Sequence, residues 1–177
     1  MIRNPLDFNL PDVTATEALG RALARSLPGG KSAAAADLPS AVVYLQGELG
    51  AGKTTCVRSL LRTLGVVGLV RSPTYTLVET YPLGALTCVH VDLYRLQTLT
   101  EVDELGLRDL VGPGCLLLVE WPEKGSAALP PADLDVRLRY EGEERRVCLQ
   151  GLSPSGAEWI GNLGRDSSLS SYVSNLT

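Results

Sequence analysis

The segment GELGAGKT at residues 47–54 limits the possible folds of this chain more than any other feature of its sequence. It fits the pattern G-x-x-x-x-G-K-[ST], in which glycines let backbone N–H groups close around phosphate oxygens. An apolar run at 41–45 precedes it, and an amphipathic helical pattern follows it at 53–64. In such a strand–loop–helix unit the positive end of the helix dipole faces the bound phosphate. The sequence therefore predicts an α/β chain with a nucleotide-binding P-loop.

The positions of this loop have separate chemical tasks. The three glycines permit backbone angles and a close approach to phosphate that a side chain would block. Lys53 places a positive charge at the β- and γ-phosphate oxygens, and the hydroxyl of Thr54 is a hard oxygen ligand for Mg²⁺. The residues predicted to bind the nucleotide are Gly47, Glu48, Leu49, Gly50, Ala51, Gly52, Lys53 and Thr54.

A P-loop protein that hydrolyses ATP also needs a carboxylate to hold the metal or its waters. Asp92 ends the run CVHVD and Glu120 ends the run LLLVE. Both follow apolar strands, and open α/β sheets bind ligands at the carboxyl ends of their strands. Either carboxylate alone could be a solvated strand end, but the P-loop requires an acidic partner. The spacing does not say which of the two contacts the metal and which orients the attacking water.

One short segment and two single residues each allow two interpretations. The segment SPTY at 72–75, which contains Thr74, is either a phosphate-sensing switch or a turn stabilised by its proline. His90 lies on the same strand face as Asp92 and is either a catalytic or a core residue. Trp121 either stacks at an interface or packs in the core.

Composition excludes several functional classes. The 177 residues carry 16 Lys and Arg against 20 Asp and Glu, a net charge of −4. Phosphates attract a basic surface, so this balance argues against a general nucleic-acid binder. No apolar run approaches the ~20 residues of a membrane span, and no secretory signal is recognisable, so we expect a cytoplasmic protein. The four cysteines are expected to be buried or semi-buried thiols and form no C-x-x-C pair; they are Cys56, Cys88, Cys115 and Cys148.

Periodicity and turn residues predict the remaining elements. A helix at 14–26 would be capped by Thr14 or Thr16, and Gly65 would end the helix that follows the loop. Shorter helices are expected at 101–110 and 157–163. Strands are expected at 41–45, 76–81, 86–94, 115–120, 134–140 and 145–149. Residues 1–165 would then form a single P-loop domain, and the Ser-rich segment 166–177 a frayed tail.

Five motifs in a fixed order together resemble one family. They are GELGAGKTT at 47–55, SPTYTLVE at 72–79, HVDLYR at 90–95, ELGL at 104–107 and VEWP at 119–122. With this order and spacing, the chain resembles TsaE, the bacterial ATPase of tRNA threonylcarbamoyladenosine biosynthesis, over about residues 10–140. Residues 28–37 and 166–177 look like additions to the family pattern.

This resemblance implies a three-layer P-loop fold with a mixed, largely parallel sheet between helices. It implies an ATPase that uses ATP and Mg²⁺ and is weak alone. Its partners would be TsaD and TsaB, which transfer threonylcarbamoyl to a tRNA adenosine beside the anticodon, so that tRNA is reached only through them. This accords with the acidic charge of the chain.

The resemblance also assigns residues. Lys53 and Thr54 would bind phosphate and Mg²⁺, Thr55 and Asp12 would join the nucleotide site, and Thr74 would belong to the switch-like loop. The implied catalytic residues are Asp92, Glu120, Lys53 and Thr74. The implied metal ligands are Thr54, Glu120 and Asp92, with Glu120 the first choice among the carboxylates.

Two other functions fit a P-loop chain of this length. A small-molecule or nucleotide kinase needs an Arg-rich lid that excludes water. The arginines after Glu120 lie mostly in hairpin-like strands, at 137, 139, 145 and 146, and no lid-like helical pair is visible. A nucleotide-gated binding module would use the same residues as an ATPase, and only turnover with and without partners separates these two.

Overall fold

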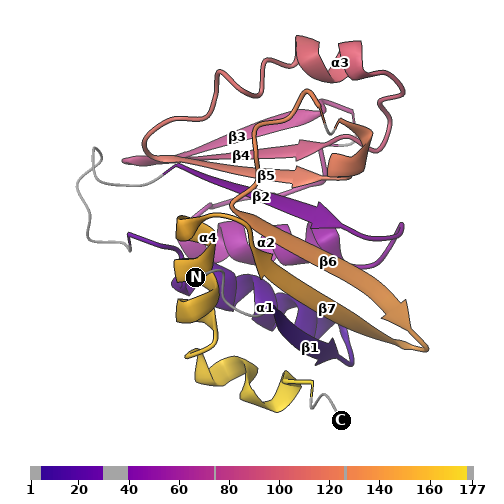
Figure 1. Cartoon of the computed structure of the whole chain (residues 1–177), viewed down its shortest axis with the longest axis vertical. Coiled ribbons are helices and arrows are strands. Elements are labelled where there is room, and N and C mark those ends of the chain that lie inside the picture. Colours follow the sequence, from indigo (N-terminus) through magenta and orange to yellow (C-terminus); the bar gives the residue numbers. More distant parts are fainter. Residues whose placement is uncertain (1–4, 30–39, 74, 126, 175–177) are drawn as a thin grey trace.

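The computed structural model describes residues 5–29, 40–73, 75–125 and 127–174. A seven-stranded sheet runs through the molecule in the order β1-β7-β6-β2-β5-β4-β3 (Figure 1). Its strands are β1 (Leu6–Leu10), β2 (Ala41–Gln46), β3 (Val78–Leu83), β4 (Leu86–Asp92), β5 (Cys115–Glu120), β6 (Leu134–Glu141) and β7 (Glu144–Gly151). The central strands β6, β2, β5 and β4 pair in parallel, and the flanking pairs are antiparallel. The predicted mixed sheet is confirmed, and its parallel pairings lie in the centre.

Helices cover both faces of this sheet (Figure 1). They are α1 (Val13–Arg25), α2 (Lys53–Leu64), α3 (Leu99–Glu104) and α4 (Pro154–Leu163), with short 3-10 turns η2 (Pro122–Lys124) and η3 (Ser167–Tyr172). Alternate residues of the central strands enter two separate hydrophobic clusters: Leu116 and Leu118 pack with α1, α2 and α4, whereas Leu117 and Val119 face α3. Strands covered on both faces need continuous apolar sequences, which explains the run CLLLVE.

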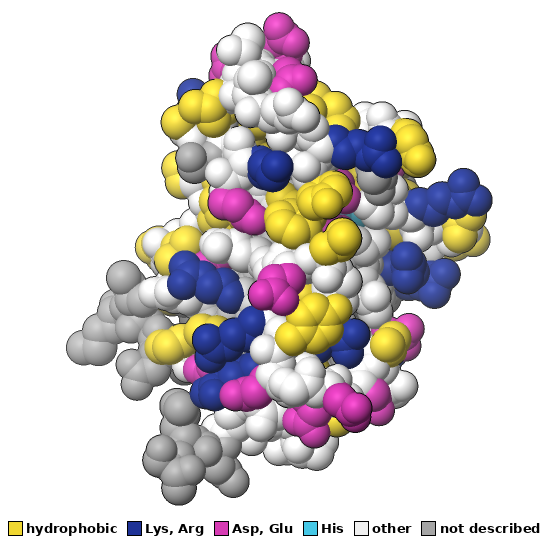
Figure 2. Space-filling model, turned by 90° about the vertical axis from the view of Figure 1, so that its right-hand side faces the viewer, with side chains coloured by type: hydrophobic (Ala, Val, Ile, Leu, Met, Phe, Trp, Pro, Cys, Tyr) yellow, Lys and Arg dark blue, Asp and Glu magenta, His cyan; other side chains and the backbone are white. Residues whose placement is uncertain are grey.

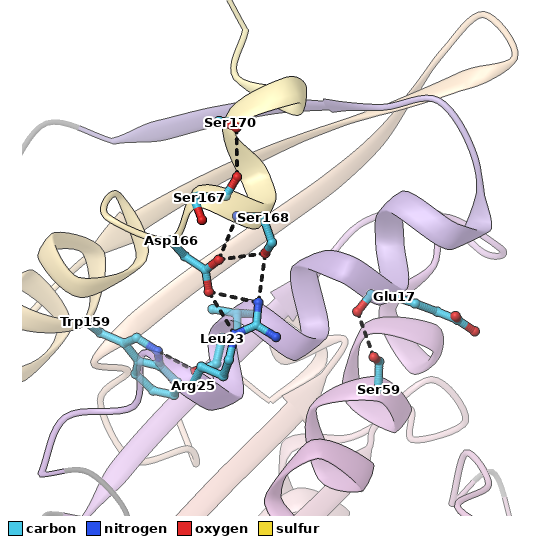
Figure 3. A network of polar contacts seen from close by, with 9 residues as sticks. All are labelled: Glu17, Leu23, Arg25, Ser59, Trp159, Asp166, Ser167, Ser168 and Ser170. Atoms are coloured by element: carbon cyan, nitrogen blue, oxygen red, sulfur yellow. Dashed lines mark hydrogen bonds and ion pairs between the residues drawn. The ribbon is translucent and has the colours of Figure 1, made fainter.

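Helix α1 packs closely on α2, the helix that follows the P-loop. A Cβ at Gly20 of α1 would overlap the carbonyl oxygen of Cys56 on α2, so glycine is required at this crossing. The hydroxyl of Ser59 also donates to the carbonyl of Glu17 at 2.7 Å (Figure 3). Helix α2 ends at Gly65, as predicted, where φ is 115°. No helix in the described parts of the chain is long and apolar enough to cross a membrane.

Several predicted boundaries differ from the structure. The predicted cap of α1 is wrong, because Asp12 rather than Thr14 or Thr16 accepts the Ala15 N–H, at 2.7 Å. Helix α3 stops at Glu104 instead of reaching 110, since the chain turns at Gly106 with φ of 60°. Helix α4 begins three residues earlier than predicted, at Pro154, with Ser153 as its N-cap.

The two flanking ends of the sheet also differ from expectation. Strand β1 was not predicted; it forms by antiparallel pairing with the distant β7. Strand β3 lies at Val78–Leu83 rather than 76–81, paired with β4 in the expected hairpin. The hairpin of β6 and β7 is confirmed. All four cysteines are free, and three of them are buried.

The C-terminal segment packs against α1, unlike the frayed tail expected from its serines. The carboxylate of Asp166 accepts hydrogen bonds from Arg25 Nε and Nη2 at 3.0 and 2.9 Å (Figure 3). Leu169 of η3 is buried, and Val173 bridges to Phe8 of β1. This segment is ordered because Leu169 enters the hydrophobic core beside α4. The indole N–H of Trp159 on α4 donates to the carbonyl of Leu23 and so ties α4 to α1. Residues 175–177 and most of the predicted connector at 28–37 lie outside the described residues.

Candidate functional site

The loop at 47–52 joins β2 to α2 at the carboxyl edge of the sheet. Gly47, Gly50 and Gly52 have φ values of 139°, 79° and 107°, a region that L side chains rarely adopt. A Cβ at Gly47 would also overlap the carbonyl oxygen of Leu138 on β6. The backbone path itself therefore requires the glycines of the motif.

Lys53, the first residue of α2, extends its side chain back over this loop. Its Nζ donates to the carbonyl oxygens of Gly47 and Glu48, at 2.6 and 2.8 Å, and lies 3.8 Å from the centre of the Trp121 ring. Burial lowers the pKa of Lys53, and the carboxylate of Glu120 opposes this shift most strongly. The contacts hold a buried positive charge where phosphate oxygens would meet the loop.

The two predicted carboxylates lie side by side beneath the loop. Asp92 and Glu120 are register partners at the ends of the parallel strands β4 and β5, and both are buried. The Thr54 hydroxyl donates to Glu120 Oε2 at 3.0 Å. Asp92 instead accepts from the Ser72 hydroxyl at 2.5 Å and from the Tyr94 N–H at 3.0 Å. Glu120 is thus adjacent to the P-loop hydroxyl, and Asp92 to the segment that precedes β3.

A cavity of about 330 Å³ opens among these groups. It is lined by Leu49, Gly50, Gly52, Lys53, Thr54, Thr55, Ser72, Asp92, Tyr94, Glu120 and Trp121. Figure 2 faces the carboxyl edge of the sheet and shows hydrophobic side chains near its centre, with Lys and Arg side chains spread around them. The cavity combines a glycine loop, a buried lysine and two carboxylates, which is the arrangement that phosphate transfer requires.

A family model described as threonylcarbamoyl adenosine biosynthesis protein TsaE matches residues 10–148. The chain belongs to the TsaE family. Members of this family are proteins of tRNA threonylcarbamoyladenosine biosynthesis. The resemblance noted in the five sequence motifs is therefore confirmed, and the match includes every residue that lines the cavity.

Individual TsaE proteins and one solved structure agree with this assignment. The chain is 45% identical to the Haemophilus influenzae TsaE over 106 residues, which cover 60% of this chain and 67% of that protein. It is 41% identical to the Synechocystis TsaE over 128 residues, covering 70% and 74% of the two chains. The crystal structure of Bacillus subtilis YdiB superposes with a TM-score of 0.70 at 26% identity, covering 93% and 97% of the two chains.

In this member of the TsaE family, aromatic side chains border the cavity. Trp121 follows β5 in a left-handed conformation, with φ of 61°, which turns its ring over Lys53. The rings of Tyr94 and Trp121 are 5.0 Å apart, and the guanidinium of Arg95 lies 4.5 Å from the ring of Tyr75. The sequence left Trp121 open between interface and core. In the structure it is partly buried, packs against the hydrophobic cluster on the α3 side of the sheet and also lines the cavity.

His90 contacts Glu120 from the interior of the protein. It is fully buried on β4, and its Nε2 lies 2.8 Å from Glu120 Oε1. The sequence left its role open, and the only available signal was that His90 and Asp92 share a strand face. The distance to Glu120, on a different strand, could not be read from the sequence.

Arg145 reaches the P-loop from the β6–β7 hairpin and was not predicted. Its side chain lies beside Gly52, and its guanidinium is 5.5 Å from the ring of Tyr140. The buried Nε of Arg145 has no hydrogen-bond partner among the described residues. No local sequence pattern connects this hairpin to the loop, since about half of the chain separates Gly52 from Arg145.

The residues assigned through the family resemblance have different outcomes. Asp12 caps α1 and does not line the cavity. Thr74 lies outside the described residues. Thr55, in contrast, lines the cavity as the resemblance implies.

The oxygen atoms beneath the loop fit a magnesium ion. A hydroxyl and two carboxylates, from Thr54, Glu120 and Asp92, are the hard donors that Mg²⁺ prefers. Across the described part of the chain, no group of three or more His, Cys, Asp and Glu side chains could hold a metal ion. Phosphate oxygens would therefore have to complete the coordination, as is usual when Mg²⁺ binds together with a nucleotide.

Proposed function

We propose that this chain is a Mg²⁺-dependent ATPase of the cytoplasm that supports threonylcarbamoyl transfer to a tRNA adenosine beside the anticodon. It would act through TsaD-like and TsaB-like proteins, which hold the tRNA. The cavity carries this proposal, because Lys53, Thr54 and Glu120 all line it and Thr54 is hydrogen-bonded to Glu120. Membership of the TsaE family supports the pathway.

The residues would divide the work of hydrolysis. The loop N–H groups and Lys53 would bind the β- and γ-phosphates. Lys53 would then exchange its contacts with the Gly47 carbonyl and the Trp121 ring for phosphate oxygens. Thr54 and Glu120, which are hydrogen-bonded to each other, would hold the metal, and Asp92, which accepts a hydrogen bond from Ser72, would orient the attacking water. Bound Mg²⁺ neutralises charge on the phosphates.

Turnover of ATP tests this proposal directly. We expect weak hydrolysis by the chain alone and faster hydrolysis when TsaD-like and TsaB-like proteins and tRNA are added. Rapid phosphate transfer to a small metabolite would instead indicate a kinase. Tight ATP binding with negligible turnover under all conditions would indicate a nucleotide-gated binding module.

The partners are expected to dock on the aromatic mouth of the site. Trp121 contacts both Lys53 and Tyr94, so a phosphate that engages Lys53 alters the surface next to it. Trp, Tyr and Arg are the side chains most enriched in interface hot spots. Trp121→Ala should therefore weaken partner binding by at least about tenfold, and affinity should differ between ATP-analogue and ADP states.

Surface plasmon resonance with immobilised partner measures both effects. Leu152→Ala is the matched control, because Leu152 is 47% exposed and follows β7 at the opposite edge of the sheet. Equal partner affinity in the two nucleotide states would exclude this coupling.

Arg145 is expected to contribute to nucleotide affinity. Its unpaired Nε lies beside Gly52, where the helix begins, and a hydrogen bond from a charged donor contributes about 1.5–3 kcal/mol. Arg145→Ala should weaken ATP binding about tenfold in calorimetry. Arg146→Ala is the control, since neighbouring strand residues point to opposite faces of the sheet. Arg146 forms an ion pair with Asp7 at 3.4 Å, although its buried Nε, like that of Arg145, has no hydrogen-bond partner among the described residues. Equal ATP affinity of the two variants would show that Arg145 does not contribute to nucleotide binding.

A further inference from the structure

The interior of the site contains a hydrogen bond that neither the motifs nor the family assignment explains. His90 is fully buried, and its Nε2 lies 2.8 Å from Oε1 of Glu120, whose side chain is 3% exposed. The other oxygen of that carboxylate, Oε2, accepts the Thr54 hydroxyl at 3.0 Å. Each oxygen of Glu120 is therefore held by a donor from a different element, β4 on one side and α2 on the other.

The strand register explains how His90 reaches the carboxylate. Asp92 pairs with Glu120 and His90 pairs with Leu118 in the parallel ladder of β4 and β5. Residues two apart share a strand face, so His90 lies one diagonal step below Glu120. Helix α2, which carries Thr54, covers this same face. The carboxylate is thus enclosed between a strand and the first turn of the P-loop helix.

Simple packing does not account for a histidine at this position. The imidazole must carry its proton on Nε2 to donate to the carboxylate, which leaves Nδ1 as an acceptor. This buried Nδ1 has no hydrogen-bond partner among the described residues. Leucine would fill similar space without leaving a polar atom unpaired, and unpaired buried groups are destabilising. The hydrogen bond to Glu120 is what the histidine adds.

We propose that His90 is a positioning residue that orients the Glu120 carboxylate toward Thr54 and thereby sets the affinity of the site for a divalent cation. The inference rests on the proposed ATPase function, because it needs Glu120 to contact a metal held with the nucleotide. Groups that hydrogen-bond a metal-binding carboxylate typically change metal affinity by about 10–100-fold when they are removed. Affinity for metal-free nucleotide depends instead on the loop and Lys53.

Three variants test this role. His90→Leu removes the donor, His90→Gln keeps an amide nitrogen at a similar reach, and Cys88→Ala trims the same buried face of β4 two residues earlier. Binding of Mn²⁺ in the presence of ADP is measured by electron paramagnetic resonance, and binding of ADP in EDTA by calorimetry. We expect His90→Leu to weaken Mn²⁺ binding at least about tenfold with ADP binding in EDTA unchanged. His90→Gln should restore most of the loss, and Cys88→Ala should bind Mn²⁺ like the parent.

A double-mutant cycle with Glu120→Gln separates positioning from general destabilisation. If His90 acts through Glu120, His90→Leu adds no further loss of Mn²⁺ affinity in the Glu120→Gln background. An additive loss, or parental Mn²⁺ affinity in His90→Leu, overturns the inference. Should His90→Leu melt early, His90→Asn replaces it, because the shorter amide stops at the position of Nδ1. A parent chain that binds ADP but no Mn²⁺ would overturn the proposed Mg²⁺ dependence itself, which is a different result from equal binding by parent and variant.

Discussion

Replacing Lys53 with alanine is expected to abolish measurable ATP binding. Lys53 is 4% exposed, and its ammonium is already held over the loop by the carbonyls of Gly47 and Glu48. It is therefore preorganised for the β- and γ-phosphates, and its loss leaves their charge without the nearest cation. Two charge-assisted hydrogen bonds at about 1.5–3 kcal/mol each correspond to an affinity loss of at least about 100-fold.

Calorimetry with ATP measures this loss, and Lys124→Ala is the matched control. Lys124 lies near the same edge, with its Nζ 5.9 Å from the ring of Tyr94, but it does not line the cavity. We expect Lys124→Ala to bind ATP as the parent does. Near-normal affinity of the Lys53 variant would contradict the assignment of the loop to phosphate binding.

Replacing Asp92 or Glu120 with alanine is expected to slow hydrolysis at least about 100-fold while nucleotide binding stays largely intact. The carboxylates lie under the phosphate end of the cavity, where they contact the Thr54 and Ser72 hydroxyls rather than the loop backbone. In the proposed mechanism their loss would remove the groups that act on the metal and the attacking water, whereas Lys53 and the loop would still bind the nucleotide.

Single-turnover hydrolysis and calorimetry on the same samples separate these two effects. Glu123→Ala is the control, because Glu123 lies just beyond β5 and does not line the cavity. Since removal of Glu120 also leaves the His90 nitrogen without its partner, Glu120→Gln should accompany the alanine variant. If either carboxylate variant hydrolyses ATP at the parental rate, that carboxylate has no role in hydrolysis and only ends its strand.

Features that depend only on residues close together in the chain were predictable from the sequence. The pattern GELGAGKT dictates a loop of glycines before a helix, and the structure has this loop between β2 and α2 with all three glycines at positive φ. Helix α2 ends at Gly65 because glycine adopts the left-handed conformation without strain. The carboxylates Asp92 and Glu120 end apolar strands, and parallel strands bring their carboxyl ends to one edge.

Contacts between distant segments were decided only by the tertiary structure. Strand β1 forms because the distant β7 provides the edge with which it pairs. Leu169 orders the C-terminal segment because the core beside α4 accepts it, although the surrounding serines indicate a frayed tail.

The same division runs through the site. Sequence alone determined the glycine loop before α2 and the two carboxylates at strand ends, since backbone conformation and strand ends depend on neighbouring residues. The position of Trp121 over Lys53, the bond from His90 to Glu120 and the approach of Arg145 to Gly52 depend on strand order and register. These arise from burial over the whole sheet, which no local pattern specifies, so only the folded chain decided which side chains meet the loop.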